Sequence, residues 1–249
     1  MGKMLAVKLF GANDIRLVNC DVPQIVEGEI LVKTSIAAIC GTDIRMIKNG
    51  YNGISEERPL TLGHEVSGII EQSEVKEGDY YPGMKVTIAP NIGCGTCEMC
   101  KKGDVHLCCN YRALGIHMDG CMAEYVRVPA KAVNQGNVIP IPEGVTMEEA
   151  SVFEPMACVM NGQDRAEVTW GDKVLIIGAG PIGVMHALMA HAKGASEIYI
   201  NDLSNERLEQ CAKKYPFVKT LHCSDLREGV LETTEGAGVD VCILSLIHI

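Results

Sequence analysis

The sequence has no excess of positive charge and no long apolar run. Its 22 Lys and Arg residues are outnumbered by 32 Asp and Glu residues, which gives a formal net charge of −10. Such a chain repels nucleic acid and anionic membrane surfaces, so neither is an expected partner. No stretch approaches the roughly 18 apolar residues of a membrane span, and residues 1–7 have no sustained signal-peptide core. We therefore expect a cytoplasmic protein.

Cysteine, in contrast, is abundant: the chain has 12 cysteines in 249 residues. In a short secreted chain they would indicate a disulfide framework. This chain is longer, has no signal sequence, and groups several cysteines between Cys94 and Cys109. Close grouping favours metal binding over disulfides.

The first part of the chain is predicted to be rich in β-strands. Runs of β-branched residues end at Gly or Pro, as strands commonly do. The expected strands cover residues 29–34, 66–71, 85–89 and 123–128. Short strands with this punctuation indicate a compact barrel-like or sandwich domain.

The pattern becomes helical near residue 146. Thr146 and Glu149 have the spacing of a capping box, which predicts a helix that ends before Pro155. A second helical segment is expected at about residues 157–166. Strands and helices then alternate, which predicts a parallel, doubly wound sheet. The strands are expected at 173–177, 197–200, 218–221 and 239–244, and the helices at 181–193, 205–214 and 225–234.

A glycine motif follows the first strand of this alternating region. Gly178, Gly180 and Gly183 form GxGxxG at the start of a helix, and Asp202 follows 19 residues after Gly183. This context predicts a dinucleotide site, with the pyrophosphate at the helix N-terminus and the Asp202 carboxylate on the ribose hydroxyls. That carboxylate would repel a 2′-phosphate, so NAD is favoured over NADP. A glycine-rich turn without a ligand is the alternative. The expected cofactor-binding set also includes Pro181, Ile182 and Arg207.

Four cysteines have the spacing C-x2-C-x2-C-x7-C: Cys94, Cys97, Cys100 and Cys108. Four thiolates this close can surround Zn²⁺ tetrahedrally and leave no open position, so the predicted zinc is structural. An iron–sulfur cluster also uses four thiolates and is the chemical alternative. Buried free cysteines would not explain the spacing. We assign no role to Cys109.

A second set of candidate metal ligands is scattered along the chain. Cys40, His64, Glu65 and Glu154 are unremarkable singly, because a lone His or Cys is more often structural. The order Cys-Gly-Thr-Asp, Gly-His-Glu, four-cysteine loop, Glu-Pro and GxGxxG resembles the zinc-containing medium-chain dehydrogenases. Glu154 followed by Pro resembles the sorbitol dehydrogenase branch.

The resemblance implies an α/β architecture with a GroES-like, β-rich catalytic domain over residues 1–153. A Rossmann domain over residues 154–249 follows, and the active-site cleft lies between the two. A structural zinc lobe is expected at about residues 90–110, which gives two zinc ions per chain together with NAD. The parent protein is expected to be a homodimer or homotetramer.

The resemblance also implies residue roles. Cys40, His64 and Glu154 would hold a catalytic zinc, with Glu154 binding directly or through a water, and Glu65 would lie close enough to visit the metal. Asp43 would hydrogen-bond the free ring nitrogen of His64. Thr42 would accept the substrate's hydroxyl proton.

The implied activity is hydride transfer from a secondary alcohol of a polyol to NAD. Threonine and butanediol dehydrogenases share these motifs and remain alternatives. A non-catalytic, zinc-stabilised nucleotide-binding fragment and a redox-sensing thiol protein are hypotheses of other classes.

Three positions depart from the family pattern. Arg45 stands where many relatives carry a proton-relaying His. Arg cannot act as a base at neutral pH, so it either binds an anionic substrate group or is simply solvated. Glu74 stands at a position where the family often has a small residue or Gly, and it is interpreted as a surface-turn variation. The alternating region offers four strands where the fold has six, so we expect a truncated chain with a foreign tail at residues 242–249 and an aggregation-prone edge strand.

Overall fold

A computed structural model describes residues 2–76, 78, 80–223 and 225–245 of the chain. The chain divides into two compact units, Met1–Glu154 and Pro155–Ile249, which are described separately. Residues 246–249 of the expected foreign tail lie outside the described residues. No helix in the described part of the chain is long and apolar enough to cross a membrane.

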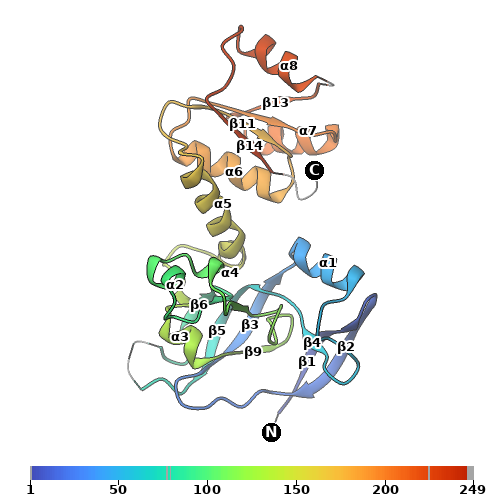
Figure 1. The fold of residues 1–249 in the computed structure, drawn as a ribbon, viewed down its shortest axis with the longest axis vertical. Coiled ribbons are helices and arrows are strands. Elements are labelled where there is room, and N and C mark those ends of the chain that lie inside the picture. Colours follow the sequence, from blue (N-terminus) through green and yellow to red (C-terminus); the bar gives the residue numbers. More distant parts are fainter. Residues whose placement is uncertain (1, 77, 79, 224, 246–249) are drawn as a thin grey trace. The chain divides into compact units, whose positions relative to one another are not determined.

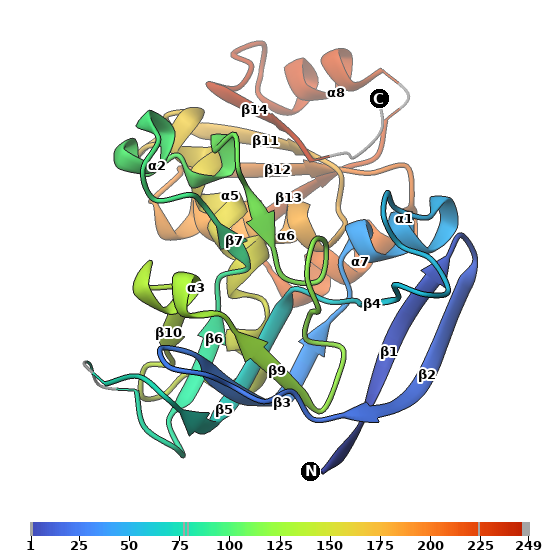
Figure 2. The same cartoon turned by 60° about the horizontal axis from the view of Figure 1, so that its bottom comes forward.

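The first unit is built on antiparallel sheets. Its largest sheet has the strand order β10-β6-β5-β3-β9, and a smaller sheet has the order β2-β1-β4. Figure 2 shows β9, β3 and β5 side by side. The strands are β1 (Lys3–Gly11), β2 (Asp14–Asp21), β3 (Ile30–Ala38), β4 (Leu60–Thr61), β5 (Glu65–Ser73), β6 (Lys85–Ile88), β9 (Tyr125–Val128) and β10 (Val138–Pro140).

The predicted strands correspond to β3, β5, β6 and β9, and the β-rich fold class is confirmed. One face of the five-stranded sheet forms a core with the short helix α3 (Ala130–Asn134), through side chains such as Val32, Val66 and Val126. Nothing in the sequence pattern indicated the β1–β2 hairpin, which exposes Leu17 and part of Ile15. Glu74 is exposed just after β5, as expected of a surface turn.

The helix expected from residue 146 begins as predicted. Thr146 caps α4 (Met147–Ser151): its hydroxyl accepts from the Glu149 backbone N–H at 3.1 Å, and Glu149 accepts from the Thr146 backbone N–H at 2.9 Å. The Ser67 hydroxyl donates to the Met147 carbonyl at 2.7 Å, which ties α4 to β5.

The prediction that this helix ends before Pro155 is confirmed, since α4 ends at Ser151. The break falls at Val152, and α5 (Phe153–Arg165) carries Pro155 in its first turn. Proline is tolerated there because the first backbone N–H groups of a helix have no intrahelical acceptor. The proline therefore lies in the first turn of the second helical segment, which begins at Phe153 and not at the expected residue 157.

The second unit is a parallel sheet with the strand order β13-β12-β11-β14 (Figure 1). The alternation predicted from the sequence is confirmed, including four strands among the described residues. These elements are β11 (Lys173–Ile177), α6 (Pro181–Ala192), β12 (Glu197–Asn201), α7 (Asn205–Lys214), β13 (Val218–Leu221), α8 (Leu226–Thr233) and β14 (Val241–Leu244).

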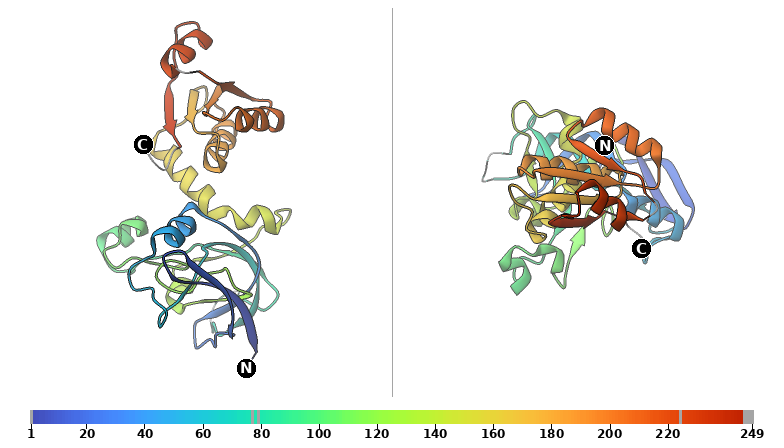
Figure 3. Two further views of the ribbon diagram at one scale, coloured as in Figure 1. Left: turned by 90° about the vertical axis from the view of Figure 1, so that its right-hand side faces the viewer. Right: turned by 90° about the horizontal axis from the view of Figure 1, so that it is seen from above.

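The helices of this unit cover both faces of the sheet (Figure 3). Ala187 of α6 and Leu208 of α7 pack with Ile176 on one face, while Val230 of α8 packs with Leu175 on the other. Right-handed crossovers between parallel strands explain why the helices lie on both faces. After β13 the chain crosses back over the sheet, and β14 pairs with the side of β11 opposite β12. The reversal is the topological switch point where doubly wound folds bind ligands.

A tight contact between β3 and β5 leads to a stability prediction. A Cβ atom at Gly68 would lie 2.5 Å from the Lys33 carbonyl oxygen, next to a bulge in β3. We expect Gly68→Ala to destabilise the first unit by about 1–3 kcal/mol, because the sheet must shift to admit a methyl group. Denaturant unfolding followed by circular dichroism measures the change. Gly11→Ala is the matched control, since nothing lies within 4 Å of its Cβ position; equal loss in both variants would contradict the prediction.

Candidate functional site

The four spaced cysteines converge in one lobe. The sulfur atoms of Cys94, Cys97, Cys100 and Cys108 all lie within 4.8 Å of one another, and Cys94 Sγ and Cys100 Sγ are 3.9 Å apart. Zinc–sulfur bonds of about 2.3 Å in a tetrahedron place sulfurs about 3.8 Å apart. Cysteine sulfurs this close together fit a single metal ion better than an iron–sulfur cluster with several iron atoms.

Backbone N–H groups point at these sulfurs. Cys94 Sγ accepts from the N–H of Cys97 at 3.2 Å, and Cys108 Sγ accepts from the N–H of Cys94 at 3.2 Å. The hydroxyl and backbone N–H of Thr96, with the Cys97 N–H, lower the pKa of Cys94 to about 5. The Gly95 N–H lowers the pKa of Cys100, but desolvation and the neighbouring thiols outweigh it and raise that pKa to about 11. The Cys94 N–H likewise lowers the pKa of Cys108. The lobe thus favours thiolates at two positions, and collecting four of them needs a cation.

Local structure fixes the lobe in place. Cys97 is the N-cap of α2 (Glu98–Lys102), which is followed by the 3-10 turn η1 (Val105–Leu107). The pair β7 (Asn91–Ile92) and β8 (Arg112–Ala113) closes its base. The side-chain amide of Gln135 binds both backbone groups of Gly93. Its Oε1 accepts from the Gly93 N–H at 3.1 Å, and its Nε2 donates to the Gly93 carbonyl at 3.0 Å. No local sequence pattern indicates Gln135, because its partner Gly93 is 42 residues away.

A second cluster joins residues that are distant in the sequence. Donor atoms of Cys40, His64 and Glu65 lie within 4.8 Å of one another. Cys40 is the N-cap of α1 (Gly41–Asn49), while His64 directly precedes β5 and Glu65 begins it. His64 and Glu65 are each 6% exposed, so the cluster is shielded from most solvent. A thiol, an imidazole and a carboxylate form a donor set that suits zinc.

Negative charge surrounds His64. Burial lowers its pKa, but the hydrogen bond to Cys40 and the charges of Asp43 and Glu154 outweigh burial and raise it. Burial raises the pKa of Glu65, and the charge of Glu154 raises it further. Glu154 thus acts electrostatically on both residues, although it does not belong to the 4.8 Å cluster. A divalent cation would relieve this repulsion.

The expected hydrogen bond between Asp43 and His64 is not formed. Asp43 Oδ1 and His64 Nδ1 are 3.8 Å apart, and the buried Nδ1 has no hydrogen-bond partner among the described residues. Asp43 instead accepts from the N–H of Cys40 at 2.9 Å and of Gly63 at 3.2 Å. Both carboxylate oxygens already accept backbone N–H groups, so Asp43 orients the backbone around the cluster.

Thr42 and Arg45 lie on α1. Thr42 is half-buried two residues after Cys40, and Arg45 is exposed. Residues three apart share one face of a helix, so Arg45 is on the face of Thr42. Arg45 forms no ion pair with any residue that the structure describes.

The glycine motif forms the expected strand–turn–helix in the second unit. Gly178 has φ of +111°, a conformation that only glycine adopts readily. A Cβ atom at Gly183 would lie 1.8 Å from the Gly178 carbonyl oxygen, so the third glycine allows α6 to approach β11. Gly180 caps α6, and its Cβ position meets nothing within 4 Å. Pro181 and Ile182 follow in the first turn.

Asp202 directly follows β12, and its side chain contacts the glycine turn that follows β11. Its carboxylate accepts from the N–H of Ala179 at 2.8 Å and of Ser204 at 2.9 Å. Burial would raise the pKa of Asp202, but these N–H groups and the charge of Arg207, 3.5 Å away, lower it.

Asp202 and Arg207 line an open pocket of about 950 Å³ at the carboxyl ends of β11 and β12. Its other lining residues include Gly178, Asn201, Leu203 and Gln210. Leu203 is 93% exposed, and the sequence pattern gave no reason to select it. The expected cofactor residues on this unit are thus gathered at one end of the sheet.

Comparisons with known proteins agree with this arrangement. Residues 26–143 match the alcohol dehydrogenase GroES-like domain. The chain is similar to a sorbitol dehydrogenase of Bombyx mori, with 34% identity over 84% of the chain and 59% of the relative. It is similar to an L-threonine 3-dehydrogenase of Pyrococcus abyssi, with 34% identity over 96% of the chain and 68% of the relative.

Solved structures show the same fold. A zinc-binding dehydrogenase from Sinorhizobium meliloti 1021, bound to NADP, superposes with a TM-score of 0.82 and 31% identity, covering 98% of this chain and 70% of that one. The chain thus spans about three fifths to two thirds of the length of the curated relatives named above. The GroES-like fold, the parallel sheet and the shared sequence lead to one conclusion: this chain belongs to the zinc-containing medium-chain dehydrogenase family.

Proposed function

We propose that the protein is a zinc-dependent dehydrogenase that transfers hydride from a secondary alcohol, of the polyol class, to NAD. The observation that carries the proposal is the convergence of Cys40, His64 and Glu65 donor atoms within 4.8 Å. This open donor set occurs in one chain with a closed four-sulfur lobe and a glycine turn suited to a dinucleotide. The sorbitol dehydrogenase relative supports the polyol class, and the threonine dehydrogenase relative keeps an amino-acid substrate as the second candidate.

The residues of the cluster have separable tasks. Cys40 and His64 would hold the ion, with Glu65 and Glu154 as carboxylates able to complete or exchange its coordination. Zinc at this position supplies Lewis acidity toward an alcohol oxygen. Thr42 accepts the hydroxyl proton of the substrate. Asp43 keeps the Cys40 and Gly63 backbone fixed through its two hydrogen bonds.

The nucleotide residues orient the cofactor. The N–H groups at the start of α6 face the pyrophosphate, and Gly180 leaves room for its approach. Asp202 lies where the adenosine ribose of NAD is bound in doubly wound folds. The cytoplasmic location and the homodimeric or homotetrameric parent stay predictions.

An assay separates this function from its alternatives. We expect NAD reduction with at least one member of a polyol panel, and loss of that activity in Cys40→Ser. A chain that binds NAD but reduces none with polyols, threonine or butanediol would instead be a non-catalytic nucleotide-binding protein. Free thiols counted with and without a chelator test the thiol-sensor hypothesis, since metal-independent disulfides among the 12 cysteines would favour it.

Zinc content provides a test that does not depend on activity. We expect two zinc ions per chain, and one in Cys40→Ser or in Cys100→Ser, because each variant loses a thiolate ligand from a different site. Atomic emission spectroscopy of dialysed protein measures the ratio. A chelator should lower the thermal stability of Cys40→Ser, which keeps the lobe zinc, more than that of Cys100→Ser. Unchanged zinc content in Cys40→Ser would contradict the catalytic site.

Cofactor choice tests the role of Asp202. The carboxylate should repel the 2′-phosphate of NADP, and like charges brought together cost several kcal/mol. We expect Asp202→Ser to raise kcat/KM for NADP relative to NAD by at least about tenfold, while serine still accepts one backbone N–H. An NADP preference in the unmodified protein would refute the assignment.

Arg45 tests whether the substrate is anionic. If its guanidinium binds a phosphate or carboxylate, Arg45→Ala should raise KM for a phosphorylated polyol about 10- to 100-fold, the loss expected for a charge-assisted hydrogen bond. KM for the matched neutral polyol should not change, and Arg45→Lys should retain part of the affinity. Equal kcat/KM values for the two polyols in the unmodified protein would instead mean that Arg45 is only a solvated side chain.

A further inference from the structure

The backbone just before His64 is held between two other segments of the first unit. Residues 61–63 lie between β1 on one side and residues 119–122, named here the brace, on the other. The bonds that join them are Leu62 N–H to Val7 O at 3.2 Å, Gly120 N–H to Thr61 O at 2.8 Å, Cys121 N–H to Gly63 O at 3.0 Å and Met122 N–H to Leu62 O at 2.8 Å. None of these residues belongs to the candidate metal cluster.

Glycine makes this contact possible. A Cβ atom at Gly120 would lie 2.0 Å from the Gly63 carbonyl oxygen and 2.5 Å from the Gly115 Cα. A Cβ atom at Gly115 would lie 2.2 Å from the same carbonyl oxygen. All of these obstacles are backbone atoms, so a side chain at Gly120 could be admitted only by moving the Gly63 peptide. Because Gly63 is bonded directly to His64, that movement would displace His64 as well.

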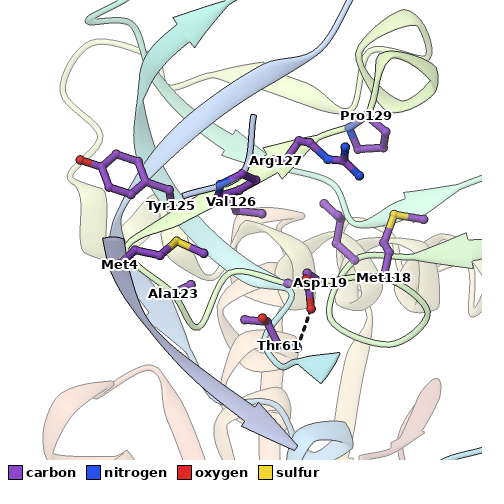
Figure 4. A pocket seen from close by; sticks show the side chains of 12 residues that line it. Met4, Thr61, Met118, Asp119, Ala123, Tyr125, Val126, Arg127 and Pro129 are labelled. Atoms are coloured by element: carbon purple, nitrogen blue, oxygen red, sulfur yellow. Dashed lines mark hydrogen bonds between the residues drawn. The ribbon is translucent and has the colours of Figure 1, made fainter. Parts of the chain in front are cut away.

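Two side chains of the brace anchor the same stretch at its ends. Asp119 Oδ1 accepts from the Thr61 N–H at 2.8 Å, which Figure 4 shows beside a pocket also lined by Met4 and Met118. The Cys121 thiol, which is 2% exposed, donates to the Glu65 carbonyl at 3.7 Å. The brace therefore contacts the chain before His64 and after it.

The Gly63 peptide is fixed from both directions. Its N–H donates to Asp43 of α1 at 3.2 Å, and its carbonyl accepts from Cys121 of the brace. Cys40 also belongs to the α1 region, as the N-cap of that helix. The separation between Cys40 and the His64–Glu65 pair thus depends on where the brace holds the intervening backbone.

We infer that the brace, through Asp119 and Gly120, positions His64 and Glu65 against Cys40 and so sets the metal-binding geometry of that cluster. The inference rests on the proposed catalytic metal site. Asp119 and Gly120 are positioning residues, since they act through the backbone of residues 61–65. Outer partners of metal ligands typically change metal affinity by about 10- to 100-fold when removed.

Cobalt substitution tests the inference without an activity assay. Co²⁺ replaces zinc in the full chain, and the visible spectrum of Cys40→Ser, which retains the four-cysteine lobe, is subtracted. The remaining absorption belongs to the Cys40 cluster and reports its geometry. We expect Gly120→Ala to bind this second Co²⁺ about 10- to 100-fold more weakly and with shifted bands.

Two controls separate positioning from stability. Gly68→Ala should destabilise the same unit, because its obstacle is also backbone, yet leave the cobalt bands unchanged. Asp119→Ala removes the acceptor for the Thr61 N–H and should weaken Co²⁺ binding, while Asp119→Asn keeps an acceptor oxygen and should restore it. The exposed Asp119 side chain makes this pair informative even if Gly120→Ala does not fold.

The outcomes are distinguishable. No absorption difference between the unmodified chain and Cys40→Ser would overturn the proposed metal site itself. A clear difference that is the same in Gly120→Ala and Asp119→Ala as in the unmodified chain would overturn the role of the brace and leave the metal site standing. Equal losses in Asp119→Ala and Asp119→Asn would also count against the brace.

Discussion

Repulsion between closely spaced acidic donors is the constraint on which both candidate metal sites depend. Four cysteine sulfurs lie within 4.8 Å of one another in the lobe, and Cys40 and Glu65 lie equally close in the second cluster. Burial and the hydrogen bonds to the neighbouring thiols oppose the ionisation of Cys100 and raise its pKa to about 11. A divalent cation turns the repulsion into coordination. The fold brings these groups together, and the ion makes their ionised forms compatible.

The two sites reach this convergence by different routes. In the lobe, all four sulfurs come from 15 consecutive residues, and backbone N–H groups within the loop orient them. In the second cluster, Cys40 and His64 are on separate elements, so their approach depends on the packing of β5, α1 and residues 119–122. Glycine at 63, 115 and 120 allows three backbones to meet where side chains could not fit. The closed four-cysteine site is formed by one local loop, whereas the open Cys40 site is formed by tertiary packing.

This difference explains what the sequence could predict. The lobe was predicted from cysteine spacing and the glycine turn from its motif between a strand and a helix, because the geometry of both is local. The second cluster needed the resemblance to a family, since nothing local links Cys40 to His64. Gln135, Asp119 and Gly120 were not identified as site residues, because their partners are between 42 and 59 residues away. The expected Asp43–His64 hydrogen bond is absent for the same reason: whether Asp43 binds a ring or a backbone depends on neighbours that the sequence does not reveal.

The second unit shows how topology alone can select a binding edge. The order β13-β12-β11-β14 requires the chain to cross back over β11, which sends α8 to the face opposite α6 and α7. The reversal places a switch point between β11 and β14, where doubly wound folds bind ligands. Gly178 turns the chain at that edge, and the Ala179 N–H donates to Asp202 from the next strand. The N–H groups of Ala179 and Ser204 fix the direction of the Asp202 carboxylate, which suits the part in choosing NAD over NADP that we propose for its charge.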